Sequence, residues 1–293
     1  MQTRVSSEIM PLGPCGVVVQ NAASSLEEVE SEQVRDLLRA HGVVLFRGFS
    51  ADDAMFSGFT KRFSSSFVGL LHRPEMRESV DGDGATSTVT VGSQLIAHHQ
   101  EMGYSPVHPD LLWFLCITPA KNRGETFVCD GAALWEQMDD DLRDQFRREK
   151  VVYRFRRAGP DVWCFITGFD CTQEQALSAF EVNEGISARA NADGTIDIDY
   201  RVSAVVRTRY GGTEAFVNSV IVQKAGSVYF EDGTPILRPV QMRLLELATP
   251  LSSNIRWQPG DIAMIDNTRC LHGRNGFADS GRQIHVRMSY ANF

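Results

Sequence analysis

Short runs of apolar and β-branched residues recur from about residue 89 to the end of the chain, and they limit the fold more than any other feature. They include LLWFLCI at 111–117, TFVC at 126–129, IAMID at 262–266 and QIHVRMSY at 283–290. Because these runs do not alternate regularly with helical patterns, they favour a β-sandwich or jelly roll over a doubly wound parallel sheet. We therefore predict a mainly β fold with helical additions.

Composition and charge exclude several classes of protein. The net charge of −8 leaves no basic surplus to neutralise phosphates, so we expect no nucleic-acid partner. No apolar stretch has the length of a transmembrane helix, and the first residues lack the apolar core of a signal peptide; we expect no membrane partner and a cytoplasmic location. The six cysteines include no C-x-x-C pair, which argues against a disulfide framework and a zinc-thiolate site.

The segment AHHQEMGY at 97–104 places two histidines close to a carboxylate. On a regular strand, side chains two positions apart share a face, so His99 and Glu101 would lie side by side while His98 points away. Two ligands from one segment cannot complete a metal site, and His272 in DNTRCLHGRN is the best third candidate. Two histidines and one carboxylate are the iron ligands of non-haem Fe(II) oxygenases. Alone, however, an H-x-E tripeptide also fits a proton-transfer pair or unrelated surface residues.

Residues near the end of the chain favour the metal hypothesis. Oxygen activation at such iron sites commonly uses 2-oxoglutarate, whose distal carboxylate needs a cation, and arginine binds carboxylates best because its guanidinium forms a bidentate fork. Arg282 follows His272 at the start of the last predicted strand, and Thr126 in GETFVCDG could add a hydroxyl donor. Thr126 and Arg282 are therefore candidates for binding 2-oxoglutarate, and Arg287 lies on the same predicted strand.

These segments resemble the taurine dioxygenase / clavaminate synthase-like family of Fe(II)/2-oxoglutarate oxygenases. The resemblance runs from about residue 41 to residue 290 and is carried by three blocks in the family's order: HGVVLFRGF at 41–49, HHQEMGYSPVHPDLLWFLCITPAKNRGETFVCDG at 98–131, and MIDNTRCLHGRNGF with GRQIHVRMSY at 264–290. It implies a double-stranded β-helix (jelly-roll) core. It also implies that His99, Glu101 and His272 are the iron ligands, and that Thr126 and Arg282 bind the 2-oxoglutarate carboxylate.

Two positions carry further expectations. Arg287 matches a second arginine that some family members use for an acidic substrate group, but it lies five residues from Arg282 instead of the usual four. Either the strand contains a bulge or Arg287 has another role, such as an exposed strand cation. A glutamate at position 101, where many family members have aspartate, resembles the branch of the family that hydroxylates amino acids and related natural-product precursors. Related halogenases have a small residue in this place, so an intact carboxylate argues against halogenation.

The expected activity is hydroxylation of a small molecule, an amino acid or natural-product precursor, with Fe(II), 2-oxoglutarate and O₂, giving succinate and CO₂. Desaturation or cyclisation on the same site, a hydrolytic zinc site and a non-enzymatic metal-binding jelly roll stay open as alternatives. We expect one oxygenase domain over residues 1–293, with residues 154–234 as a lid, and leave the oligomeric state open. The candidate substrate contacts are Ser93, Gln94, Arg207, Asn218 and Arg287.

Overall fold

The structure is a computed structural model that describes residues 8–20, 25–69, 77–80, 84–90, 92–224, 226–279 and 281–293. Among these residues, every helix is too short or too polar to cross a membrane.

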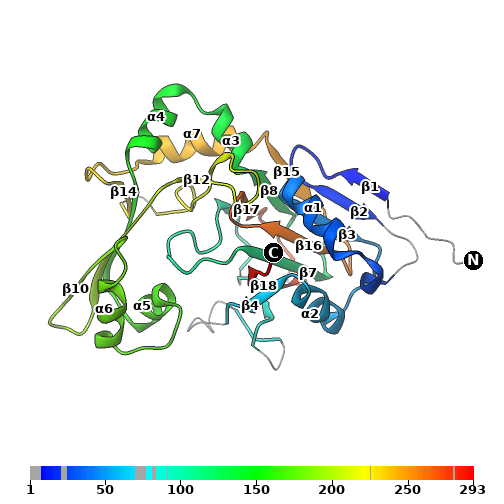
Figure 1. Ribbon diagram of the computed structural model, residues 1–293, viewed down its shortest axis with the longest axis horizontal. Helices are drawn as coiled ribbons and strands as arrows, with labels where there is room; N and C mark the ends of the chain where they lie inside the picture. The colour runs from blue at the N-terminus through cyan, green and yellow to red at the C-terminus, as the bar shows by residue number, and fades with distance from the viewer. Residues whose placement is uncertain are drawn as a thin grey trace, which may run out of the picture.

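The largest sheet has eight strands in the order β1-β2-β3-β16-β7-β18-β4, with β5 paired to β18 (Figure 1). Its strands are β1 (Glu8–Pro11), β2 (Val17–Gln20), β3 (Val43–Arg47), β4 (Ser64–Phe67), β5 (Ser87–Thr88), β7 (Leu111–Thr118), β16 (Ile262–Asp266) and β18 (Gln283–Ala291). All pairs are antiparallel except β2 with β3. The central strands β3, β7 and β16 are buried almost throughout, which explains their continuous apolar sequences.

A smaller sheet of four antiparallel strands packs against one face of the large sheet. Its order is β15-β8-β17-β6, with β6 (Ile96–His99), β8 (Thr126–Asp130), β15 (Ser252–Ile255) and β17 (Cys270–Arg274). A hydrophobic cluster joins the two sheets, because it contains Val128 and Ile255 from the small sheet and Leu112, Ala263 and Val286 from the large one. Two facing sheets with a shared core confirm the predicted double-stranded β-helix with helical additions.

Helices cover the opposite face of the large sheet. They are η1 (Leu26–Glu28), α1 (Ser31–His41) and α2 (Asp53–Lys61), and their buried side chains pack with Phe46, Trp113 and Met264 in a second cluster. The sequence contains the stop signal of α1, since Gly42 adopts a left-handed conformation with φ of 71°.

A third sheet lies at one end of the molecule, away from β1 and β2 (Figure 1). Its order is β10-β11-β9-β14, with β9 (Val151–Ala158), β10 (Ile186–Ala190), β11 (Ile196–Val202) and β14 (Val228–Phe230). The helices α5 (Pro160–Thr167) and α6 (Gln173–Glu181) pack together beside it in a small apolar cluster. This sheet and these helices make up much of the predicted lid at 154–234.

The remaining elements bridge this third sheet and the jelly roll. They are α3 (Gly131–Gln137), α4 (Asp140–Arg148), α7 (Arg238–Ala248) and the hairpin β12 (Val205–Arg207) with β13 (Glu214–Phe216). One continuous cluster contains Trp135 of α3, Phe146 of α4, Val228 of β14 and Leu271 of β17. The third sheet therefore shares a core with the small sheet that carries the candidate ligands.

Candidate metal centre

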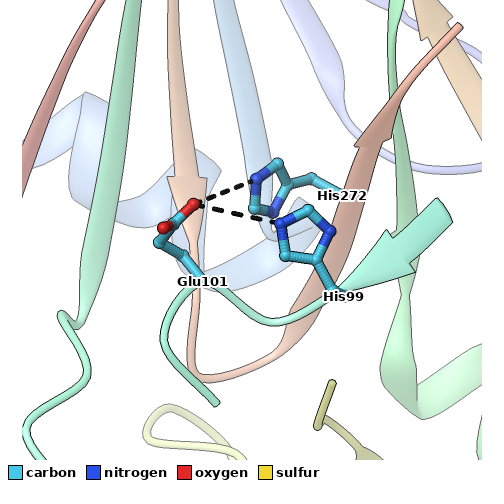
Figure 2. A group of neighbouring side chains, drawn as sticks. All are labelled: His99, Glu101 and His272. Carbon is cyan, nitrogen blue, oxygen red and sulfur yellow. Dashed lines mark ion pairs between the residues drawn. The ribbon is translucent and has the colours of Figure 1, made fainter. Parts of the chain in front are cut away.

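Three side chains that lie far apart in the sequence converge beside the small sheet (Figure 2). The Glu101 carboxylate faces both imidazoles, with its Oε2 atom 3.6 Å from His272 Nε2 and 4.0 Å from His99 Nε2. One ligand atom from each residue lies within 4.8 Å of the others. Ligands about 2.1 Å from a common ion are about 3 Å apart at neighbouring octahedral positions, so a small inward movement of these atoms would enclose a metal.

The two histidines are held by a strand pair. His99 is the last residue of β6 and pairs directly with His272 on β17, and their ring centroids are 4.3 Å apart. Gly273, which follows His272, allows this strand to run against Phe127, because a Cβ at Gly273 would lie 2.2 Å from the phenylalanine ring. His98 points to the other face as expected, where it contacts Ser252 and Phe127.

Glu101 differs from the expected geometry because it does not lie on a strand. β6 ends at His99, and Glu101 begins a turn that includes Met102 with a positive φ of 57°. The prediction that His99 and Glu101 share the face of a regular strand is therefore wrong, although their side chains do converge. The turn has to be held by contacts other than a strand ladder.

Asn267 supplies several of those contacts. Its side-chain oxygen accepts a hydrogen bond from the Glu101 backbone N–H at 2.9 Å, and its amide donates to the Glu101 carbonyl at 3.1 Å and the Pro109 carbonyl at 2.8 Å. The Gln100 side-chain amide in turn donates to the Asn267 carbonyl at 3.0 Å. Asn267 is fully buried and lies in the connection from β16 to β17, which carries His272. One amide therefore joins both ligand-bearing segments.

The protonation states at the site favour a cation. Burial lowers the pKa of His99 to about 4, so its ring is neutral near pH 7. The His99 Nδ1 atom lies 2.9 Å from the Ala97 carbonyl; Nδ1 is then the protonated nitrogen, which leaves the Nε2 lone pair facing Glu101. Burial alone would raise the pKa of the Glu101 carboxyl, but the Arg77 guanidinium and His272 hold that pKa well below its usual range. Two imidazoles and a carboxylate are a donor set that suits Fe(II).

A cavity lined by several arginines adjoins the three side chains. It measures about 50 Å³ and is lined by His99, Glu101 and His272 together with Thr126, Arg274, Arg282 and Arg77. It shares Arg274 and Arg282 with a neighbouring cavity of about 420 Å³. The structure thus brings all five predicted metal and 2-oxoglutarate residues into one place.

The cavity holds its arginines and hydroxyl in fixed positions. Arg282 Nε donates to the Gly124 carbonyl at 3.0 Å, and burial together with the charge of Arg274 lowers the Arg282 pKa to about 10, which leaves it charged. Trp257 Nε1 donates to Thr126 Oγ1 at 3.1 Å, so the Thr126 hydroxyl proton can be donated elsewhere. Two adjacent cations and a free hydroxyl donor are suited to a carboxylate.

The predicted substrate contacts are not brought together by the fold. Arg287 is fully buried on the face of β18 that packs against α2, where its guanidinium donates to Thr86 at 2.6 Å and Ser57 at 3.1 Å. The alternative of an exposed strand cation is therefore wrong, and the substrate contact stays a prediction that neither cavity supports, because Arg287 lines neither of them. The register of β18 on β7 does shift between Gln283 and Ile284, but Arg287 still pairs with Trp113 and lies on the Trp113 face.

The other four candidates also have different surroundings from those expected. Asn218 is buried and bonds to the Ala204 carbonyl and the Val220 N–H, so it supports a loop. Arg207 is exposed and bonds to the Gly212 carbonyl within its hairpin. Gln94 is exposed and its carbonyl accepts from Arg274, while Ser93 lines the larger cavity. Of these five residues, only Ser93 lies at a cavity that adjoins the ligands.

Four residues at the site were not found from the sequence: Arg77, Trp257, Asn267 and Arg274. Arg274 could have been found, because it lies two residues after His272 on the same strand and thus on the same face. Asn267 lies in the quoted DNTR segment, but its clamp on Glu101 depends on a turn that no spacing rule predicts. Arg77 and Trp257 lie outside the strands and reach the site from connecting segments, which no local pattern places.

Known proteins resemble this chain over nearly its full length. A family described as "Taurine catabolism dioxygenase TauD, TfdA family" matches residues 8–290. The dapdiamide synthesis protein DdaC of Enterobacter agglomerans is 22% identical over 93% of this chain and 89% of its own length. A clavaminate synthase-like protein of Arabidopsis thaliana is 26% identical, covering 88% of this chain and 84% of its own length. The crystal structure of a taurine dioxygenase from Burkholderia xenovorans superposes with a TM-score of 0.66 at 16% identity, covering 97% of this chain and 89% of that one.

Proposed function

Since this chain belongs to the TauD/TfdA family and is an Fe(II)- and 2-oxoglutarate-dependent dioxygenase, we propose that it hydroxylates a small molecule, either an amino acid or a natural-product precursor. Succinate and CO₂ are the co-products. We treat residues 1–293 as one oxygenase domain in which residues 154–234 cover the site.

One observation carries this proposal: the His99, Glu101 and His272 ligand atoms converge on the same cavity as Thr126 and Arg282. In the proposed site, the first three residues hold Fe(II). Arg282 and Thr126 bind the distal carboxylate of 2-oxoglutarate, and Arg274 adds a second positive charge. A hydrolytic metal site would have no use for a carboxylate clamp beside the ligands.

Iron with 2-oxoglutarate and O₂ supplies the oxidant that removes hydrogen from an unactivated C–H bond. The chain supplies position and exclusion of water. Arg282 and Thr126 fix the direction in which 2-oxoglutarate enters, and Phe114 and Ile96 provide apolar walls to the cavity. The neutral His99 ring offers Nε2 without a competing proton near pH 7. Buried surroundings limit side reactions of the oxidant with water.

The substrate class is supported by relatives and by Glu101. DdaC is named for dapdiamide synthesis, which is consistent with a natural-product precursor as substrate. With a carboxylate at position 101, three protein side chains would hold Fe(II), and together with 2-oxoglutarate and O₂ they would leave no place for the chloride that a halogenase binds. Hydroxylation is therefore proposed over halogenation, with desaturation or ring closure as the alternative outcome on the same site.

Two measurements test the proposal. Anaerobic addition of Fe(II) and 2-oxoglutarate should produce the visible metal-to-ligand charge-transfer band of the chelate, and no such band would contradict the cofactor assignment. A screen of amino acids should then find one that stimulates succinate release, with ¹⁸O from ¹⁸O₂ in the product. Chlorine incorporation by the unmodified protein would contradict hydroxylation, whereas a product lacking ¹⁸O would favour desaturation or ring closure.

A further inference from the structure

The two carboxylate oxygens of Glu101 face different partners. Oε2 faces the imidazoles of His99 and His272, whereas Oε1 lies 3.0 Å from Nη2 of Arg77. The Arg77 and Glu101 side chains are 16% and 15% exposed, so this ion pair is largely shielded from water. Arg77 also lines the cavity that contains the three ligand atoms. We propose that Arg77 is a positioning residue that retains Oε1 and so makes Glu101 a monodentate metal ligand.

Glu101 needs such a partner more than either histidine does. The backbone of Glu101 is held by Asn267, but a glutamate side chain has three rotatable bonds beyond its Cα. A carboxylate with both oxygens free can bind a metal through one or through two of them. A bidentate Glu101 would occupy one of the three positions that an octahedral ion with two histidines must keep for 2-oxoglutarate and O₂. The ion pair with Arg77 engages the oxygen that would otherwise take that position.

The backbone around Arg77 is anchored well enough for this role. Glu78, the next residue, exchanges hydrogen bonds with Thr88: its N–H donates to Thr88 Oγ1 at 3.0 Å, and its carbonyl accepts from the Thr88 N–H at 2.9 Å. Thr88 belongs to β5, which pairs with β18 at His285. The Arg77 guanidinium also approaches Met288 Sδ on β18 at 3.6 Å. Pairing with the large sheet therefore fixes the segment from which Arg77 reaches Glu101 Oε1.

The positive charge of Arg77 distinguishes the proposed positioning role from a purely structural role, because the two roles predict opposite changes in metal affinity. Arg77 is a cation beside a site for a divalent cation, so their repulsion opposes metal binding. If Arg77 served only to keep the site folded, its removal would weaken metal binding. If it retains Oε1, removal both relieves the repulsion and frees a second donor, so metal affinity should stay level or rise while one coordination position is lost.

The experiment counts water on the metal, and it needs neither substrate nor turnover. The full-length protein is loaded with Mn(II) and saturated with 2-oxoglutarate, and the relaxation rate of water protons reports exchangeable water on the ion. The unmodified protein should retain one bound water. Arg77→Met should lose it, reducing the relaxation enhancement to less than about half, with Mn(II) affinity by calorimetry equal to or tighter than that of the unmodified protein. Arg77→Lys, which keeps the charge, should restore the water.

A matched control is Arg154→Met on β9, which removes the ion pair with Asp199 in the third sheet, outside the metal cavity. It should leave relaxation and affinity unchanged. Retention of the bound water by Arg77→Met, or weakened Mn(II) binding in both Arg77 variants, would overturn the inference. The inference rests on the proposed function, but the two can fail separately. Without the charge-transfer band in the unmodified protein the proposed function fails, whereas a normal band with unchanged water in Arg77→Met defeats only the role of Arg77.

Discussion

The two segments that carry the candidate ligands are held in different ways. His99 and His272 face each other across the β6–β17 pair, so a backbone ladder fixes their separation. Glu101 lies two residues beyond the end of β6, in a turn that Asn267 and Ser219 help to hold through hydrogen bonds, and Arg77 binds its carboxylate. A ladder is built from backbone groups that every residue has, whereas the position of Glu101 also depends on particular side chains, among them Asn267 and Arg77. The histidine side should therefore tolerate changes around it, and the glutamate side should not.

Removing a metal ligand should give the largest loss of metal affinity in this comparison. His272→Ala deletes one of two imidazoles. Loss of a residue that only orients a ligand typically costs 10- to 100-fold in metal affinity, so we expect loss of a ligand itself to cost more than about 100-fold. Calorimetry with Fe(II) under anaerobic conditions measures it. Because His98 points away from the metal, His98→Gln should retain Fe(II) binding. Equal losses in the two variants would contradict the assignment of β6 faces.

Binding of 2-oxoglutarate should depend on Arg282, whichever of the two ligand segments is altered. Arg282→Ala leaves the distal carboxylate of 2-oxoglutarate without its guanidinium partner, which costs about 2–5 kcal/mol when the pair is buried. We therefore expect 2-oxoglutarate affinity, measured from the charge-transfer band, to fall at least about 30-fold while Fe(II) binding stays near normal. Arg287→Lys, on the opposite face of β18, is the control and should leave 2-oxoglutarate affinity unchanged. An unchanged affinity in Arg282→Ala would shift the role to Arg274.

The clamp on Glu101 can be broken without touching a ligand. Asn267→Asp is nearly isosteric but removes the amide that donates to the Glu101 and Pro109 carbonyls. We expect Fe(II) affinity to fall about 10- to 100-fold, as is typical for residues that orient ligands. On the histidine side, Ser252→Ala removes the partner of His98 and should change Fe(II) affinity much less. Equal losses of Fe(II) affinity in the two variants would contradict the expectation that the glutamate side depends more on single side chains than the histidine side does.

The sequence predicted residues whose positions follow from strand geometry or from family motifs. His99, Thr126 and Arg282 lie in or beside strands that were recognised as apolar runs, and the jelly-roll fold follows from the same runs. His272 was found from its motif, since its strand β17 was not predicted. The helix α5 was missed, although Pro160 at its first turn and Gly168 at its end are ordinary helix signals. Its apolar sequence, PDVWCFIT, has a weak helical period because the helix is buried on several sides.

Other features could not be derived because they depend on how distant segments meet. The side of β18 on which Arg287 lies is set by its pairing with β7, including the shift near Gln283, and by the α2 helix that covers it. Asp52 caps α2, and not the nearby Ser50, which has a positive φ of 51°. Arg77 approaches Glu101 only after β5 has paired with β18. No local pattern in the sequence encodes these contacts.

The smallest expected effect concerns pH and the strand-held side of the site. Burial lowers the pKa of His98 to about 4, below its usual value near 6.5. The unfolded chain therefore binds a proton more readily than the folded protein, so stability is complete above about pH 6.5 and declines as the pH falls toward 4. Between pH 7.5 and 5.5 this group should cost about 1 kcal/mol of folding free energy. Urea denaturation of the metal-free protein at both pH values measures the loss, and His98→Gln should reduce it. If His98→Gln left the pH dependence unchanged, His98 would not be the buried neutral histidine that braces β6, and the ladder would rest on its backbone pairing alone.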